Sequence, residues 1–228
     1  MQLMQKVTAP LFALAAGFAA GKHQNKKSSG AGKTRVIGSF LLILSGCTTT
    51  SQSGQPVTSW DIHQQALQTI SGYQATGKLG YISPEQRFTA NLNWKNETGA
   101  DHLRLTNFLG TTLLKLDTQP GRAVLIDNDG KRYQGPDAAA LVLKLTGISL
   151  PVNQMRDWLI GLPSGADTYQ LNAENRVAYL AKQVGSQLWQ LDYNVYDESA
   201  TPALPSRLVL SQGDIRITLL INRWQVQP

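Results

Sequence analysis

The segment Arg87-Phe88-Thr89-Ala90-Asn91-Leu92-Asn93-Trp94-Lys95 decides the fold class, because polar and apolar side chains alternate in it without a break. Successive side chains of a β-strand point to opposite faces of a sheet, so this alternation predicts a strand with one apolar and one solvated face. Similar alternation recurs in Trp189–Val195 and in Ile215–Asn222. Strands with one wet face are typical of antiparallel sheets, and we therefore predict an antiparallel sheet.

Further strands are predicted from weaker alternation and from turn residues between the segments. They are Tyr73–Ser83, His102–Thr106, Thr112–Asp117, Ala123–Asp127, Lys131–Gln134, Asp167–Asn172, Arg176–Lys182 and Ser206–Ser211. Asp127-Asn128-Asp129-Gly130 is a typical hairpin turn. We interpret Asp127 and Asp129 as solvated turn residues rather than as a catalytic pair.

Three segments have helical features instead. Apolar residues recur at helical spacing, or a proline opens the segment, and a glycine follows each of them. The predicted helices are Trp60–Ile70, with Ser59 as N-cap and Gly72 as terminator, Asp137–Leu145, between Pro136 and Gly147, and Val152–Ile160, between Pro151 and Gly161. Helices can cover the open face of a curled sheet, so we predict one α+β domain over residues 59–228.

The chain in front of this domain has the pattern of a secretory leader. The basic segment Lys33-Thr34-Arg35 precedes the apolar run Val36–Ser45, and Leu44-Ser45-Gly46-Cys47 resembles the bacterial lipobox. In signals of that family the leader is cleaved before the cysteine, and both the thiol and the new amino group are acylated. We therefore predict that Cys47 carries a lipid anchor; the alternative is a buried structural cysteine.

These boundaries divide the chain into three parts. Residues 1–46 are the expected signal peptide, residues 47–58 a flexible tether rich in Ser and Thr, and residues 59–228 the folded domain. Lipoproteins kept in the inner membrane typically carry Asp after the acylated cysteine. Thr48 occupies that position here and favours the outer membrane, on the side that faces the periplasm of a Gram-negative bacterium.

The formal net charge of +6 comes from the leader. Residues 1–46 contain six of the 21 Lys and Arg and no acidic residue, which leaves 21 − 6 = 15 basic and 15 acidic residues. The remainder has a formal charge of zero, so the basic composition gives no reason to expect nucleic-acid binding. A single cysteine excludes a disulfide within the chain.

The motifs of common enzymes are missing from the sequence. After the leader only His63 and His102 remain as histidines, and no His-x-x-x-His or Gly-x-Ser-x-Gly pattern occurs. We therefore expect no catalytic residues, no metal and no cofactor, and we predict that the protein is not an enzyme.

The segment Asn107-Phe108-Leu109-Gly110 joins two predicted strands. Asn107 and Gly110 suit a tight turn, which leaves Phe108 and Leu109 at its tip, where polar residues are usual. Exposed apolar side chains at a tip mark a contact with a membrane or a partner. A tip folded back against its own sheet is the equally plausible alternative.

Four segments together resemble the LolB family of lipoprotein receptors. They are Leu105–Thr111, Asp127–Tyr133, Lys144–Gly147 and Arg156–Pro163, and they stand in the same order behind a matching lipobox. The resemblance runs from about Trp60 to Trp224. It implies an open antiparallel β-barrel of about 11 strands, covered by helices and enclosing a hydrophobic cavity for acyl chains.

The cavity is implied by the resemblance, because the residues alone favour a filled core. The side chains expected to line it are Leu92, Trp94, Trp189, Leu191, Ile217 and Leu219. In the family a protruding loop carries a Leu that is needed for membrane insertion, and this Leu matches Leu109. The family commonly has Pro before it, where this chain has Phe108.

The family's activity then gives the expected function. The receptor accepts lipoproteins from the periplasmic carrier LolA and inserts them into the inner leaflet of the outer membrane. The expected partners are LolA, the acyl chains of lipoproteins and outer-membrane phospholipid, and we expect a monomer. The alternative is a lipid-anchored apolar-ligand-binding or structural β-domain without transfer activity.

Overall fold

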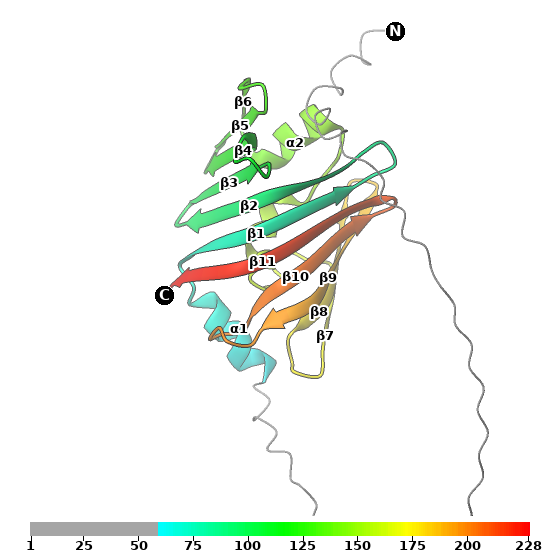
Figure 1. Cartoon of the computed structure of the whole chain (residues 1–228). Helices are drawn as coiled ribbons and strands as arrows, with labels where there is room; N and C mark the ends of the chain where they lie inside the picture. The colour runs from blue at the N-terminus through cyan, green and yellow to red at the C-terminus, as the bar shows by residue number, and fades with distance from the viewer. Residues whose placement is uncertain (1–58) are drawn as a thin grey trace, which may run out of the picture. The chain divides into compact units, whose positions relative to one another are not determined.

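The computed structural model describes residues 59–228, which fall within one compact unit (Figure 1). The predicted signal peptide, the tether and the anchor Cys47 lie outside the described residues. None of the helices within residues 59–228 is long and apolar enough to cross a bilayer.

The described part contains three helices and an 11-stranded sheet. The helices are α1 (Trp60–Gln68), α2 (Ala138–Thr146) and α3 (Val152–Leu159). The strands are β1 (Gly72–Ile82), β2 (Arg87–Glu97), β3 (Ala100–Thr106), β4 (Thr112–Gln119), β5 (Arg122–Asp127), β6 (Arg132–Gly135), β7 (Thr168–Leu171), β8 (Val177–Val184), β9 (Gln187–Asp197), β10 (Leu204–Gln212) and β11 (Ile215–Gln227).

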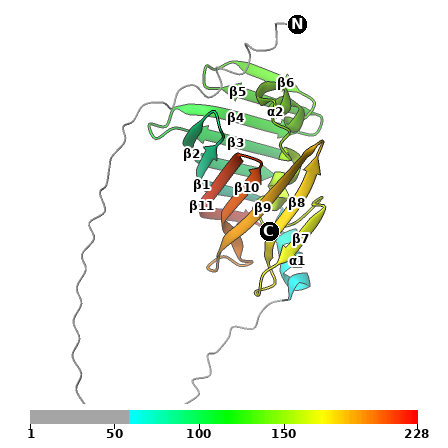
Figure 2. The same cartoon turned by 90° about the vertical axis from the view of Figure 1, so that its right-hand side faces the viewer.

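All neighbouring strands are antiparallel, in the order β6-β5-β4-β3-β2-β1-β11-β10-β9-β8-β7. The first and last strands therefore pair at the centre of the sheet, while β6 and β7 form its two edges. Figure 2 shows that the sheet curls, so that β7–β9 turn toward the side on which α2 lies. The predicted antiparallel sheet with covering helices is confirmed, and the sheet is open.

The apolar positions of the alternating segments meet on the inner face of the curl. Residues from β1, β2 and β8–β11 form one hydrophobic core together with α3, whose Trp158 and Leu159 are 0% exposed. Two tyrosines hold α3 to opposite parts of the sheet. Tyr73 Oη on β1 donates to the Arg156 carbonyl at 2.7 Å, and Tyr193 Oη on β9 donates to the Trp158 carbonyl at 2.8 Å.

A second, smaller core lies under α2. Leu141 and Leu145 of this helix pack against Leu116 of β4 and Leu125 of β5. The Asp137 side chain caps the helix by accepting from the Ala140 N–H at 2.7 Å, and Gly147 ends it with a φ of 73°. These bonds satisfy donors and acceptors that every helix end leaves open.

Some predicted helix boundaries were wrong. Helix α1 ends at Gln68 with Thr69 as C-cap, and Gly72 is the first residue of β1 rather than a helix terminator. The reason is pairing with the C-terminal strand, because the Ser71 N–H already donates to the Gln227 carbonyl at 2.9 Å. Ser59 is the N-cap residue, but its side chain makes no capping hydrogen bond.

Candidate functional site

The hairpin between β3 and β4 ends in a loop that is built by one side chain. Asn107 Oδ1 accepts from the N–H groups of Leu109 at 3.0 Å and Thr111 at 2.9 Å. The Asn107 N–H donates to the Thr111 carbonyl at 2.9 Å. Gly110 has a φ of 86°, a conformation that side chains rarely adopt. These bonds fix the loop in a turn that points its two central side chains outward.

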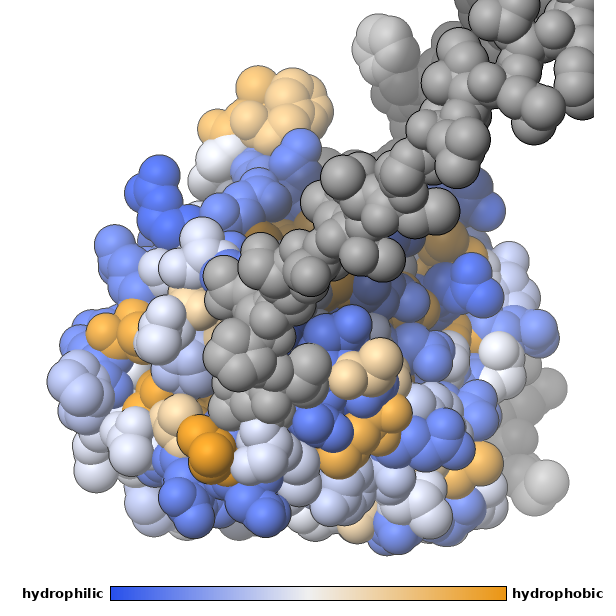
Figure 3. All heavy atoms as spheres, turned by 90° about the horizontal axis from the view of Figure 1, so that it is seen from below, coloured by the Kyte–Doolittle hydropathy of each residue, from blue (hydrophilic) through white to orange (hydrophobic). Residues whose placement is uncertain are grey.

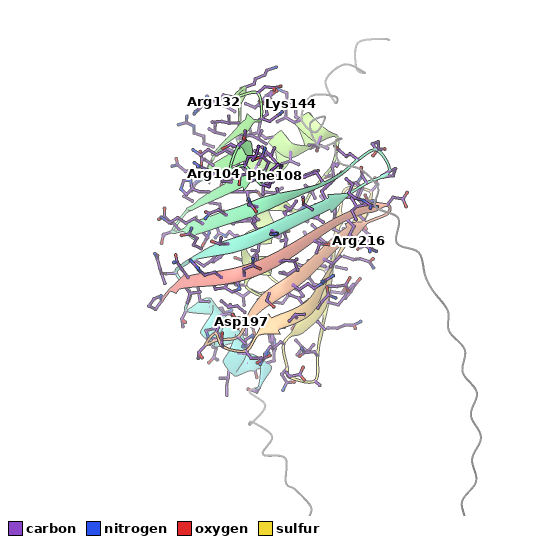
Figure 4. All side chains as sticks on the ribbon, viewed as in Figure 1. Arg104, Phe108, Arg132, Lys144, Asp197 and Arg216 are labelled. Carbon is purple, nitrogen blue, oxygen red and sulfur yellow. The ribbon has the colours of Figure 1, made fainter. Side chains whose placement is uncertain are left out.

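Phe108 and Leu109 stand at this tip and are exposed to solvent. Their exposed fractions are 88% and 75%, the largest among the large apolar side chains of residues 59–228. The tip is therefore not folded back against its own sheet. Figure 3 shows a group of apolar residues that protrudes above a mixed surface, and Figure 4 labels Phe108. Burying each of these side chains in an apolar phase would stabilise the complex by about 1.5–3 kcal/mol.

The six residues predicted to line a cavity all belong to, or pack against, the main hydrophobic core. Five are almost completely buried, namely Leu92, Trp94, Trp189, Leu191 and Leu219, and Ile217 is partly buried. Their position on the inner face agrees with the alternation of the sequence. In this conformation the inner face is covered by α3 and by the chain that leads to it.

The connection between α2 and α3 is attached to this inner face by a tryptophan. Trp189 Nε1 donates to the Ser149 carbonyl at 2.7 Å. Trp94 Nε1, on the other side of the core, donates to Asp101 Oδ1 at 3.2 Å. Both indole groups are thus satisfied where they are buried, as buried polar groups must be.

A pocket of about 260 Å³ opens where β2–β4 approach α2 and α3. It combines apolar and charged side chains, which include Trp94, Leu103, Leu116, Val152, Asp101, Arg122 and Arg156. Trp94 is the member of the predicted lining that reaches it. The pocket therefore lies next to the inner face but at the end of the strands rather than between them.

The outer face of β2–β4 carries a groove of about 620 Å³ with a network of charges. Lys115 Nζ lies 2.8 Å from Asp117 Oδ2, and His102 Nδ1 lies 2.8 Å from Asp117 Oδ1. Partial burial alone would raise the pKa of Asp117, but the hydrogen bonds from Lys115 and His102 outweigh it and hold that pKa below its ordinary value. Asp117 is therefore ionised, and its negative charge partly neutralises the groove next to Lys115 and His102.

The two histidines lie in different places. His63 lies on the buried face of α1, and His102 lies on the outer face of β3. Within residues 59–228 no group of three or more His, Asp or Glu is arranged to hold a metal ion. Asp127, interpreted above as a solvated turn residue, is in fact 5% exposed. It accepts from the N–H groups of Asp129 and Lys131 at 3.0 and 2.9 Å, so it organises its turn as Asn107 does.

Sequence reasoning missed the charged groove and the way in which α3 bridges the sheet. The spacing of Arg104, Lys115 and their neighbours places each of them on a wet face, but which cations are adjacent depends on the strand register. The tyrosines that bind α3 gave no signal of their own, because a tyrosine at an inward position is also an ordinary core residue.

The family model described as "Outer membrane lipoprotein LolB" matches residues 71–224. The outer-membrane lipoprotein LolB of Vibrio parahaemolyticus is 42% identical over 189 residues, which cover 81% of this chain and 93% of the relative. The LolB of Serratia proteamaculans is 40% identical over 199 residues, covering 85% of this chain and 96% of the relative.

Among solved structures, a LolA superfamily protein from Nitrosomonas europaea has a similar fold. The TM-score is 0.50 at 7% sequence identity, and the match covers 75% of this chain and 94% of that one. At this identity the similarity concerns the fold alone.

Proposed function

Because this chain belongs to the LolB family, we propose that it accepts lipoproteins from the periplasmic carrier LolA and inserts them into the inner leaflet of the outer membrane. The resemblance inferred from the sequence is thereby confirmed. The chain is a lipid-anchored outer-membrane protein of a Gram-negative bacterium, faces the periplasm and acts in lipoprotein localisation, and its family is not one of enzymes.

The exposed tip is the observation that carries the insertion step. Phe108 and Leu109 are held away from the sheet by Asn107, so they reach a bilayer without any rearrangement of the loop. Their combined burial would stabilise the membrane-bound state by about 3–6 kcal/mol. A contact of this strength can form and break each time a lipoprotein is delivered. Leu109 is the residue to which we assign insertion, with Phe108 beside it.

The inner face is the proposed site for acyl chains. Its lining would be Leu92, Trp94, Trp189, Leu191, Ile217 and Leu219, and α3 covers it in this conformation. Acyl chains would therefore enter as α3 and the preceding connection move outward. Each buried CH₂ contributes about 0.8 kcal/mol, so a small difference in burial between carrier and receptor is enough to set the direction of transfer.

The alternative function is a lipid-anchored apolar-ligand-binding or structural β-domain without transfer activity. The near-complete burial of the inner-face residues favours this alternative, since a filled core needs no ligand. A measurement of lipoprotein transfer distinguishes the two functions, because only the receptor has this activity.

The test uses the full mature protein anchored in phospholipid vesicles, mixed with LolA that carries a radiolabelled lipoprotein. We expect the label to leave LolA and to appear in the vesicle bilayer. In the Leu109→Glu variant we expect normal acceptance, with label that co-precipitates with the receptor, and release into the bilayer that is slower by about tenfold or more.

The matched control is Ile62→Glu on α1, which places the same charge on another exposed apolar position, 60% exposed. This variant should transfer and release lipoprotein like the wild type. Label that stays on LolA in the presence of folded wild-type protein would rule out the receptor function. Equal loss of acceptance and release in Leu109→Glu would contradict the division of roles between tip and inner face.

A further inference from the structure

Three cations share one row across the outer face of the sheet. In the strand register Arg104 of β3 lies opposite Lys115 of β4, Lys115 lies opposite Ile126 of β5, and Ile126 lies opposite Arg132 of β6. Directly opposed residues of antiparallel strands point to the same face. Arg104, Lys115 and Arg132 therefore form a row, here called the cation row, that runs across four adjacent strands.

The cation row is only partly neutralised. Lys115 forms the ion pair with Asp117 described above. Within the described part of the chain, no carboxylate lies within ion-pair distance of Arg104 or Arg132, and both side chains are exposed. Arg104 and Lys115 also line the outer groove, next to the uncharged Asn93 and Thr106. The groove thus offers positive charge and polar side chains at the end nearer the tip, while Glu97 and Asp117 lie at its other end.

The row lies just behind the apolar tip. Arg104 lies on β3 and precedes Phe108 of the β3–β4 loop by four residues; Figure 4 labels both. A strand residue spans about 3.3 Å, and β3 ends at Thr106, so Arg104 lies at most about 13 Å behind the tip. An apolar group that enters a membrane interface typically reaches about 5–10 Å below the headgroup boundary. The polar headgroup layer above that boundary is about 5–7 Å thick. A hairpin that enters upright therefore brings the cation row to the depth of the phosphate groups.

We propose that the cation row binds the phosphate groups of anionic phospholipids while Phe108 and Leu109 are inserted below them. This inference rests on the proposed insertion of the tip and extends it, because the strength of membrane binding then depends on lipid charge as well as on apolar burial. Guanidinium groups form paired hydrogen bonds with phosphate, and arginines supply two of the three cations.

A phospholipid surface fits the arrangement better than an acidic protein surface. The apolar tip and the cation row are offset along the strands by the distance that separates acyl chains from phosphates in a leaflet. A protein partner would have to provide the same layered pattern of an apolar zone beneath an anionic one. Binding to a protein is therefore the outcome that would overturn the proposal.

The test measures insertion of the tip in the full, lipid-anchored protein. An environment-sensitive dye is attached at Thr111→Cys, an exposed position next to the tip, in protein whose native cysteine is acylated. The protein is placed in vesicles of phosphatidylcholine alone and in vesicles of phosphatidylcholine and phosphatidylglycerol mixed three to one. The dye's emission gives the ratio of inserted to free tip, at low and at high salt.

The variant is Arg104→Gln with Arg132→Gln, which leaves every described ion pair intact. The control is Arg207→Gln with Arg223→Gln, which removes the same charge from exposed positions on β10 and β11. In the anionic vesicles we expect the wild type and the control to insert more than in the neutral ones. The variant should lose about fivefold in insertion per cation, about 25-fold in total, with no change in the neutral vesicles. Salt at about 1 M should abolish the difference.

Each outcome has one meaning. Equal gain from anionic lipid in the variant and in the wild type would overturn the role of the cation row, while insertion in neutral vesicles would still support the proposed function. A tip that inserts in neither lipid would reject the proposed insertion and this inference with it. Weaker transfer from LolA by the variant, together with unchanged insertion, would show that the row binds protein rather than lipid.

Discussion

Gly77 of β1 lies where the backbone of β11 approaches closely. A Cβ atom at this position would lie 1.9 Å from the Leu220 carbonyl oxygen, a backbone atom that cannot turn aside. The register between β1 and β11 shifts here, between Thr76 and Gly77. A glycine is therefore required for the irregularity that lets the first and last strands pair.

We expect Gly77→Ala to destabilise the domain by about 3 kcal/mol or more, because the β1–β11 pair must separate to accept the methyl group. Equilibrium unfolding in urea measures the change. Gly80→Ala is the matched control, since its Cβ would meet only the Thr218 Cβ at 3.9 Å. Its free energy of unfolding should stay within about 1 kcal/mol of the wild type. Similar values for both variants would show that the close approach is relaxed in solution.

The tip was predictable from single residues, whereas the cation row was not. Asn107 and Gly110 indicated a turn, and Phe108 and Leu109 are apolar where turns are usually polar. The row depends on which residues lie opposite one another. A slip of one residue in the register moves a side chain to the other face, and the register shifts between Leu105 and Thr106, so the sequence could not fix the row.

At the scale of one element, helix α1 buries His63, whose Nε2 atom has no hydrogen-bond partner among residues 59–228. His63 is 6% exposed, and its ring lies 6.2 Å from that of Trp60. Burial lowers the pKa of His63, and the positive Arg176 lowers it further, whereas Glu198 acts in the opposite direction. The Arg176–Glu198 ion pair thus faces the histidine from outside the helix.

This arrangement predicts the pH dependence of stability. Because the pKa of His63 is lower in the folded protein, the unfolded chain binds the proton first as the pH falls. The stability that comes from burying neutral His63 is fully present above pH 6.5, the ordinary pKa of histidine. It is lost as the pH falls from 6.5 toward the lower pKa of His63 in the folded protein. The free energy of unfolding, measured between about pH 5.5 and 7.5, should fall on acidification in the wild type.

The His63→Gln variant should lack this part of the pH dependence, whatever its stability at neutral pH. The comparison is of slopes, so a general loss of stability in the variant does not affect it. Identical slopes for the two proteins would mean that His63 is not protonated on unfolding in this range.

Most elements could be predicted from the sequence, because alternation and turn residues are local properties. The predicted strands and helices all exist, and their ends differ by a few residues. The end of α1 was wrong for a non-local reason, since Ser71 pairs with Gln227 at the other end of the chain. The C-terminal strand also continues to Gln227, beyond the alternation that ended the prediction at Asn222.

At the scale of the whole molecule, the inner face decides between a receptor and a filled β-domain. If acyl chains bind there after α3 moves, an environment-sensitive apolar dye should bind to a single saturable site. The rate of binding should reach a plateau at high dye concentration, because the outward movement of α3 becomes limiting. Stopped-flow fluorescence measures the rate, and acyl-chain competition identifies the site. Dye binding that never saturates would contradict the proposed site.

The sequence could not settle whether the inner face is filled, because the same apolar side chains line a cavity and pack a core. Trp94 and Trp189 were predicted at inward positions, and both lie there. What the alternation cannot encode is the distance between the two halves of the curled sheet. Helix α3 lies against both halves, with its carbonyl groups bonded to Tyr73 of β1 and to Tyr193 of β9.

The pairing of β1 with β11 also has a consequence for biogenesis. The two strands that form the middle of the sheet are the first and the last to be synthesised, and they are separated by almost the whole domain. The half formed by β1–β6 cannot pair with the half formed by β7–β10 until β11, the last strand, has been made. The sheet therefore lacks its central pair until the last strand has been made, and a chain truncated before β11 would lack the strand that joins the two halves.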